Sequence, residues 1–210
     1  MGTYIDKNFT SLIDKNKINT IIECGSRDCI DTIEMLDYYE PKIIYSFECN
    51  PDSVLVCENN IKNYNKIKLI PKATYSEKKE IDFFMTDMER SIDKNIGASS
   101  LLYHRDNKNQ FFQKKVSVDA IRLDEFMDES EINEIDLLCL DLQGSEMETL
   151  TGLGDKIKNV KYIITEVSFQ SYYVGDKMFN EINQFLEGHN FKCEKVLNYG
   201  GFGDALFIRK

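Results

Sequence analysis

The sequence of 210 residues lacks the positive charge that a nucleic-acid-binding surface needs, since its formal net charge is −10. Such a surface requires a basic patch, and the pairs Lys78-Lys79 and Lys114-Lys115 are interpreted as ordinary solvated surface. The chain also lacks an apolar run of about 18 residues, the length of a membrane span. Residues 1–19 lack the apolar core of a secretory signal. We therefore expect neither a nucleic-acid partner nor a membrane span.

Metal-binding patterns are also scarce. None of the six cysteines forms a C-x-x-C pair, and the two histidines, His104 and His189, are far apart in the sequence. A zinc site therefore has little support, and no metal is assigned. A chain of this length buries a core without disulfides, and several cysteines stand inside apolar runs, where cysteine acts as a small hydrophobe. These features predict reduced thiols and a cytoplasmic location.

Apolar runs of strand length recur along the chain and barely alternate with polar residues. Strands that are apolar on both faces belong to a parallel sheet covered by helices. Between the runs lie stretches with helical spacing, among them the segment that begins at Asn50, a plausible N-cap, and Pro51. This alternation predicts one α/β domain over residues 1–210, with residues 1–18 as a helical extension. The predicted strands are 20–24, 43–48, 67–70, 135–141 and 162–167.

Two regions depart from the alternation. Residues 80–122 hold "EIDFFM" and the alternating "KKVSVDAIRL" without a strong helix between them, which predicts an antiparallel insertion. Near the C-terminus, "FKCEKVL" and "ALFIRK" flank the Gly-rich "NYGGFGD", which predicts an antiparallel hairpin. Five parallel strands with a terminal hairpin indicate the methyltransferase variant of the Rossmann-like arrangement.

The turn after the first strand, "ECGSRD", limits the choice of cofactor. It holds one glycine, Gly25, and the dinucleotide pattern G-x-G-x-x-G is absent. A pyrophosphate needs several close backbone approaches, so a nicotinamide or flavin dinucleotide is disfavoured. S-adenosylmethionine (SAM) carries a carboxylate and an amine but no phosphate, so it needs fewer close approaches of the backbone at this turn. Its ammonium group can be met by backbone carbonyls or by Glu23 and Asp28, while Ser26 or Asp28 can cap the next helix.

Three acidic residues end predicted strands, and ligands of open α/β sheets bind at the carboxyl ends of strands. Glu48 stands where an acid accepts both ribose hydroxyls, although it can instead complement the dipole of the following helix. Asp141 follows a buried strand, and helix N–H groups after Gly144 are expected to keep it charged. Its alternative role is an N-cap. Glu166, which ends the next strand, either accepts a proton or bonds backbone N–H groups in a loop.

Six segments of the sequence, in the order in which they occur, resemble segments of the FkbM-like SAM-dependent methyltransferases. The resemblance runs from about residue 19 to residue 209, and its most specific parts are "D-x-x-G-x-E" and "ASSL". It implies a methyltransferase of sugar or natural-product hydroxyls. The sequence departs from many relatives at two places. Many relatives have a small residue, Asn and Gly where this chain has Ser26-Arg27-Asp28. Many also have Glu where this chain has Gln143. The matching segments are "IIECGSRD", "FECNPDS", "LIPKATYSE", "GASSL", "LLCLDLQGSEMETLTG" and "YIITEVSF".

The resemblance and the residues together give a predicted site. The reaction is O-methylation of a sugar or glycan hydroxyl, and a SAM- or nucleotide-binding module without catalysis is the alternative. Asp141, Glu166 and His104 are the candidate proton acceptors, although His104 also fits a surface loop. Tyrosines suit a sugar acceptor because the ring covers C–H faces while the hydroxyl bonds polar groups. The predicted acceptor wall is Gln143, Glu146, Tyr172, Tyr173 and the "NYGGFG" loop around Tyr199. The predicted cofactor residues are Glu23, Gly25, Ser26, Arg27, Asp28, Glu48, Cys49, Ala73, Thr74, Ser99, Ser100 and Asp141.

Overall fold

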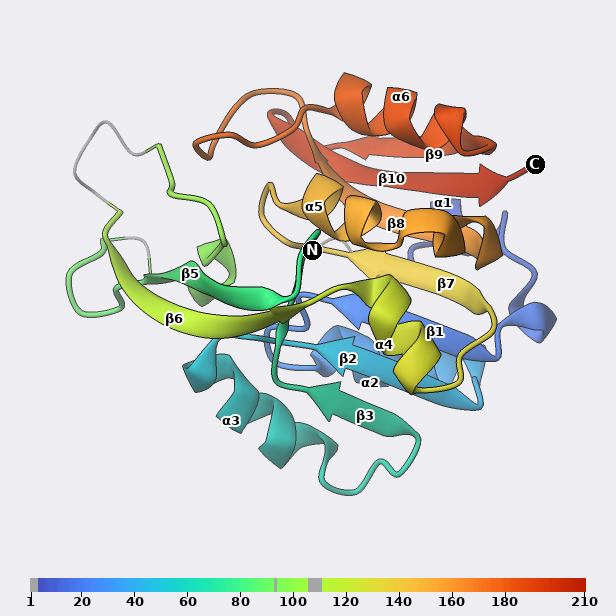
Figure 1. The fold of residues 1–210 in the computed structure, drawn as a ribbon, viewed down its shortest axis with the longest axis horizontal. Coiled ribbons are helices and arrows are strands. Elements are labelled where there is room, and N and C mark those ends of the chain that lie inside the picture. The colour runs from blue at the N-terminus through green and yellow to red at the C-terminus, as the bar shows by residue number, and fades with distance from the viewer. Residues whose placement is uncertain (1–3, 93, 106–110) are drawn as a thin grey trace.

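A twisted, mostly parallel sheet forms the centre of the computed structural model, which describes residues 4–92, 94–105 and 111–210 (Figure 1). The seven strands of this sheet lie in the order β3-β2-β1-β7-β8-β10-β9. Pairing is parallel from β3 to β8, while β10 runs antiparallel to both of its neighbours. The strands are β1 (Thr20–Cys24), β2 (Ile43–Phe47), β3 (Ile67–Ile70), β7 (Ile135–Leu140), β8 (Val160–Ser168), β9 (Phe191–Asn198) and β10 (Phe202–Arg209).

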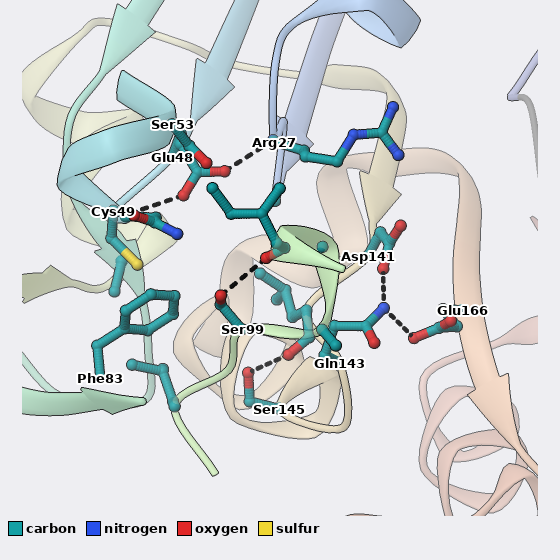
Figure 2. Close-up of a pocket in the computed structure, with 18 of the residues that line it drawn as sticks. Arg27, Glu48, Cys49, Ser53, Phe83, Ser99, Asp141, Gln143, Ser145 and Glu166 are labelled. Carbon is teal, nitrogen blue, oxygen red and sulfur yellow. Dashed lines mark hydrogen bonds between the residues drawn. The ribbon is translucent and has the colours of Figure 1, made fainter. Parts of the chain in front are cut away.

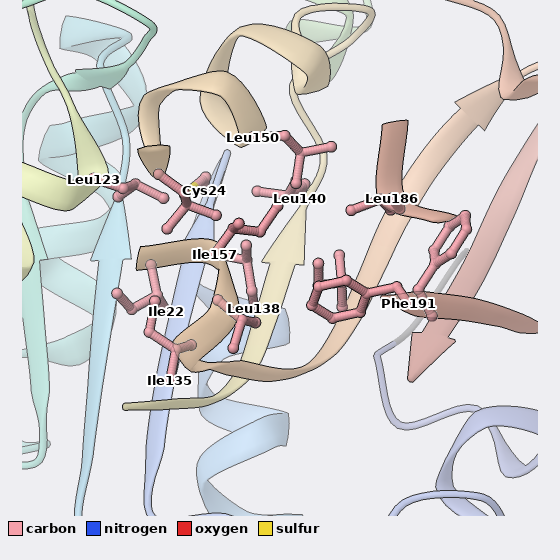
Figure 3. Close-up of a cluster of buried hydrophobic side chains, with 14 of the residues drawn as sticks. Ile22, Cys24, Leu123, Ile135, Leu138, Leu140, Leu150, Ile157, Leu186 and Phe191 are labelled. Atoms are coloured by element: carbon pink, nitrogen blue, oxygen red, sulfur yellow. The ribbon is translucent and has the colours of Figure 1, made fainter. Parts of the chain in front are cut away.

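Helices cover both faces of this sheet. One face packs against α4 (Leu123–Glu129), α5 (Glu146–Gly152), α6 (Phe179–Gly188) and the 3-10 helix η3 (Gly154–Asn159). Figure 3 shows the apolar cluster on this side, in which strand residues meet residues of these helices. The other face packs against α1 (Lys7–Thr10) and α2 (Ile30–Tyr39). Further helices are η1 (Lys15–Lys17), α3 (Pro51–Ile61) and η2 (Ile96–Ala98).

The strand β7 shows why the sequence does not alternate. All of its residues are buried, because successive side chains point to opposite faces and both faces are covered. Leu138 and Leu140 join the cluster beside α4, α5 and α6, while Leu137 and Cys139 join the cluster beside α1 and α2. The predicted parallel α/β sheet with a terminal antiparallel hairpin is confirmed.

A second, smaller sheet stands beside the first and has the order β4-β6-β5. Its strands are β4 (Ala73–Thr74), β5 (Lys79–Thr86) and β6 (Gln113–Ile121). The antiparallel pairing of β5 with β6 confirms the predicted insertion. The insertion begins earlier than predicted, because the two residues of β4 pair in parallel with the end of β6. Its buried apolar cluster holds Phe83 and Met85.

Local signals act as the sequence predicts at the start of α3. The side-chain oxygen of Asn50 accepts a hydrogen bond of 3.1 Å from the N–H of Asp52, and Pro51 is the first helical residue. This arrangement is an N-cap followed by a proline, which has no backbone N–H and therefore leaves no unpaired donor at the first helical position. Across the described residues, no helix has both the length and the apolar character that crossing a membrane requires.

Candidate functional site

A cavity of about 540 Å³ opens at the carboxyl ends of the parallel strands and is closed on one side by the small sheet and η2. This volume suits a small ligand. In Figure 2, Glu48 and Cys49 lie on one side of the cavity, while Asp141, Gln143 and Glu166 lie on the other. The predicted site residues that line it are Gly25, Arg27, Glu48, Cys49, Ala73, Thr74, Ser99, His104, Asp141, Gln143, Glu166, Tyr172 and Tyr173.

Gly25 is required because two strand ends touch at this position. Its φ is +92°, and a Cβ there would overlap the carbonyl oxygen of Asp141. The N–H of Asp141 in turn donates to the carbonyl of Cys24 at 3.0 Å. The N–H groups of Gly25 and Ser26 both donate to the carbonyl of Phe47. The single glycine therefore lets the turn after β1 lie directly against the ends of β2 and β7.

Glu48 is held by backbone N–H groups from both sides. Its Oε2 accepts from the N–H of Arg27 and its Oε1 from the N–H of Asn50, each at 2.7 Å. The residue is only 7% exposed, and burial raises the pKa of its carboxyl group to about 7. Each carboxylate oxygen can accept a second hydrogen bond, so two acceptor positions remain for a ligand that enters the cavity.

Asn50 has a buried donor beside this carboxylate. Its oxygen caps α3, which leaves its Nδ2 group as the donor of the amide. Asn50 lines the cavity and is 2% exposed, and its Nδ2 has no hydrogen-bond partner among the described residues. An unsatisfied buried donor costs about 1–3 kcal/mol. An acceptor at Glu48 and a donor at Asn50 fit the hydroxyl groups of a ribose, which both donate and accept.

Gln143 connects the two candidate catalytic carboxylates. Its Nε2 donates to Oδ1 of Asp141 at 2.7 Å and to Oε2 of Glu166 at 2.9 Å (Figure 2). Its Oε1 lies 3.1 Å from the hydroxyl of Tyr173. The backbone of Gln143 is left-handed, with φ +52°, and Gly144 follows with φ +97°. This tight turn directs the amide back between the ends of β7 and β8.

The pKa values of both carboxyl groups in this pair are raised. Burial, followed by the negative charge of Asp141, raises the pKa of Glu166 well above its ordinary value. Asp141 is exposed to the cavity but is surrounded by enough protein that lost solvation also raises its pKa. The expected lowering by helix N–H groups does not prevail, because Oε1 of Glu146 accepts from the N–H groups of Leu142 and Gly144 instead.

Two predicted cofactor residues lie beneath the first turn rather than in the cavity lining. Oε2 of Glu23 accepts from the hydroxyl groups of Thr32 and Ser46, and burial raises its pKa to about 8. The hydroxyl of Ser26 lies against that of Ser46 and donates to a backbone carbonyl. Both residues support the turn from below.

Asp28 also lies outside the lining and starts a helix. Its Oδ1 accepts from the N–H of Ile30, the first residue of α2, at 3.2 Å. Its Oδ2 lies 3.4 Å from Nε of Arg27. The Arg27 side chain lines the cavity and is about half exposed, and its guanidinium also lies 3.9 Å from Asp31.

Three other predicted residues lie outside the cavity lining. The Ser100 hydroxyl donates to the carbonyl of Gln143 at 2.9 Å, which joins the η2 loop to the turn after β7. Glu146 is buried under that turn, with a pKa that burial raises to about 7. The Tyr199 hydroxyl donates to Asp204 at 3.1 Å on the hairpin. His104 does line the cavity, where its ring packs against Tyr173.

The cavity also contains residues that the sequence did not single out as site residues. Asn50 is predicted as a helix cap, and its place two residues after Glu48 is the signal for a second role. Phe202 lies in the Gly-rich hairpin that was predicted to border the acceptor, and its aromatic ring was the signal. Phe83 belongs to β5 in the insertion, and it lines the cavity because β5 is paired with β6 in this register. No local signal indicates that orientation.

Comparisons with known proteins identify similar sequences and folds. The chain is 23% identical over 206 residues to the 2-O-methyltransferase NoeI of Sinorhizobium fredii, covering 96% of this chain and 84% of that protein. The fold is similar to an FkbM methyltransferase from Methylobacillus flagellatus, with a TM-score of 0.65 and 10% identity, over 98% of this chain and 46% of the other. It is also similar to TrmK of M. capricolum in complex with S-adenosyl-homocysteine (SAH), with a TM-score of 0.55 and 15% identity, over 100% and 69% of the two chains.

The family match covers most of the chain. The model of the methyltransferase FkbM domain matches residues 23–193, which include the turn at Gly25, the acid at Glu48 and the D-x-x-G-x-E segment. The Rossmann-like methyltransferase fold and the cofactor SAM, both predicted from the sequence, are confirmed. The chain therefore belongs to the FkbM methyltransferase family.

Proposed function

We propose that the protein transfers the methyl group of SAM to a hydroxyl group of a small-molecule or glycan acceptor. The observation that carries the proposal is the bridge from Gln143 to Asp141 and Glu166, two carboxylates at one end of the cavity. The name of the relative NoeI, a 2-O-methyltransferase, supports oxygen as the methylated atom. A cytoplasmic location and the absence of a nucleic-acid partner stay predictions.

We assign the cofactor to the end of the cavity beside Gly25 and Glu48. There Glu48 and Asn50 would hold the ribose hydroxyls, while Arg27 would pair with the carboxylate of the methionine part. Cys49, Ala73 and Phe83 line the same end and offer an apolar surface to the adenine ring. When bound, SAM supplies a methyl group on a positively charged sulfur, which is already a good leaving group. The protein then mainly has to align the acceptor.

The acceptor hydroxyl must lose a proton as its oxygen becomes methylated. Burial and the charge of Asp141 raise the pKa of Glu166 well above its ordinary value, which favours its protonated form over the proton-accepting one. Asp141 is therefore the first candidate for the proton acceptor, and Gln143 holds it in place. In this arrangement the two neighbouring carboxyl groups would have different roles. His104 remains a third candidate because its ring lies beside Tyr173 in the lining.

The test combines binding with turnover. Calorimetry is expected to show binding of SAM and SAH and poor binding of NAD. Methyl-labelled SAM, incubated with lysate of the source organism, is expected to label acceptors that mass spectrometry identifies as methyl ethers. Labelling only on nitrogen or carbon would overturn the proposal. Retention of SAM without any labelled product would favour a binding module, the alternative reading of the sequence.

A matched control separates chemistry from folding. Asp82→Asn changes an exposed acid on β5 that pairs with Lys115 at 3.2 Å, outside the cavity lining. This control should retain binding and turnover. Asp141→Asn should retain binding and lose turnover.

A further inference from the structure

Three aromatic rings gather at the acceptor end of the cavity. The ring centroid of Phe202 lies 5.8 Å from that of Tyr199 and 6.5 Å from that of Tyr172. Phe202 is 42% exposed and Tyr199 is 46% exposed, yet Phe202 and Tyr172 line the same cavity as Glu166. Contiguous exposed aromatic rings at the mouth of a cavity are typical of a ligand-binding surface.

The turn that carries these rings is fixed before any ligand arrives. The N–H of Tyr199 donates to the carbonyl of Phe202 at 2.8 Å, which closes the hairpin between β9 and β10. The carbonyl of Gly201 accepts from the N–H groups of Phe169 and Gln170. A Cβ at Gly201 would overlap the hydroxyl of Tyr172, so the two segments pack without a gap. A preformed surface binds with less loss of conformational entropy.

Strand register places this surface beside the candidate proton acceptors. Phe202 pairs with Ser168 and Asp204 pairs with Glu166, across the same antiparallel ladder. Phe202 and Glu166 are therefore diagonal neighbours on one face of the sheet, with backbones about 7–8 Å apart. A six-membered ring stacked on Phe202 would reach Glu166 and its partner Gln143 with a hydroxyl group.

The groups around the rings indicate the charge of the acceptor. The hydroxyl of Tyr172 accepts from Nε2 of Gln170 at 2.6 Å, and the hydroxyl of Tyr199 donates to Asp204. These groups and the nearby carboxylates suit a ligand with many hydroxyls. Burial, together with the charge of Asp141, raises the pKa of Asp204 to about 6. An anionic acceptor would add negative charge where acids already repel one another.

We propose that Phe202 is a specificity-determining residue on which an uncharged sugar ring stacks, and that anionic sugars are rejected. This inference rests on the proposed function, because it concerns the acceptor of the same site. Stacking covers the apolar C–H face of the sugar, while Tyr172 and the carboxylates bond its hydroxyls. A flat phenolic acceptor, which offers few hydroxyls, would leave those polar groups without partners.

The first experiment uses the fact that the chain contains no tryptophan. Phe202→Trp would introduce the single indole, whose emission reports on stacking. With SAH present, titration with neutral methyl hexopyranosides should give a saturable blue shift for at least one of them. Methyl glucuronoside should give none. No shift with any neutral glycoside, an equal shift with the glucuronoside, or a shift with catechol alone would overturn the inference.

Phe169→Trp is the matched control for the indole. Phe169 is also exposed, but its ring packs against Phe179 and it is not part of the cavity lining. Its emission should not change with the glycosides. An equal shift at both positions would indicate a bulk effect on the indole and would overturn the stacking assignment.

Kinetics with the glycoside that shifts the emission separate this inference from the proposed function. Phe202→Ala should raise the KM for that glycoside about tenfold, while Phe202→Tyr should restore it and the affinity for SAH should not change in either. Methyl transfer with an unchanged KM in Phe202→Ala would overturn the role of Phe202 and leave the proposed function standing. Stacking of the sugar on Phe202 without methyl transfer to it in the wild type would overturn the proposed function and leave the stacking role of Phe202 standing.

Discussion

The two ends of the cavity are built in different ways. At the end proposed for the cofactor, Gly25 and Glu48 each stand where a parallel strand stops, and backbone N–H groups of neighbouring turns bond the Phe47 carbonyl and the Glu48 carboxylate. At the end proposed for the acceptor, Tyr172 and Phe202 come from a loop and a hairpin, and ring packing and the Tyr172 hydroxyl against Gly201 add to the backbone bonds between them. Substitutions at the first end should therefore affect cofactor affinity. Those at the second should affect the choice of acceptor.

The largest effect is expected where the two ends meet, at Asp141. Asp141→Asn keeps the size of the side chain and loses its basicity, so turnover should fall by about 10²–10⁴-fold. Asn would still face Nε2 of Gln143, so the affinity for SAH should change little. Single-turnover kinetics with labelled SAM would measure the first quantity and calorimetry the second. Turnover near that of the wild type would remove Asp141 from the proton transfer.

At the cofactor end, Glu48→Ala should weaken SAM binding by about 1.5–3 kcal/mol, the range for hydrogen bonds to a charged group. This corresponds to roughly 10- to 100-fold in affinity. The variant also leaves the N–H groups of Arg27 and Asn50 without their acceptor, so circular dichroism must show that it is folded. Calorimetry with SAM and SAH gives the affinities. Unchanged affinity in a folded variant would place the ribose elsewhere.

Stability should decrease as the pH rises through the range in which the buried acids lose their protons. The pKa of Glu23 is raised to about 8 in the folded protein, above its value in the unfolded chain of about 4.3. Between these values the folded state binds more protons than the unfolded state, so the free energy of unfolding decreases with pH. Melting temperatures from pH 5 to pH 8 should decline, and Glu23→Gln should make the decline shallower. A decline as steep as that of the wild type would mean that Glu23 ionises freely.

The smallest expected effect concerns Asn50. Asn50→Ser keeps an oxygen that caps α3 about as well, but it removes the buried donor. If that donor serves a ribose hydroxyl, SAH affinity should fall by about 0.5–1.5 kcal/mol, and the melting temperature of the free protein should not fall below that of the wild type. The 2′- and 3′-deoxy analogues of SAH provide the control, because one of them should bind both proteins equally. A uniform loss for every analogue would contradict a contact with a single hydroxyl.

The cofactor end could be predicted from the sequence because its residues directly follow the strands that position them. Gly25 and Asp141 follow apolar runs, and the carboxyl ends of parallel strands meet at one edge. The same rule gave the wrong orientation for Glu146. A left-handed residue and a glycine turn the chain back, so Glu146 points beneath the turn and accepts its N–H groups. Such a reversal depends on backbone angles that the residue types do not specify.

The acceptor end was less predictable because distant segments assemble it. The sequence predicted the insertion and the hairpin as strands, but not which face of each would meet the cavity. The same limit applies at the cofactor end to Phe83, which reaches the cavity through the register of β5 with β6. Phe202 does so because β10 is inserted between β8 and β9. Both depend on long-range pairing, which a local pattern does not record.

The contact between Gly25 and Asp141 has a consequence for how new acceptors arise in such a protein. The two turns meet main chain to main chain, so the spacing between a cofactor resting on one turn and a proton acceptor carried by the other does not depend on any side-chain rotamer. The hairpin turn at 198–202 takes no part in this contact, so we expect changes in its rings to leave the spacing constant. If the hairpin selects the acceptor as proposed, grafting the hairpin of one relative onto another should change the acceptor and leave the methyl-transfer geometry unchanged.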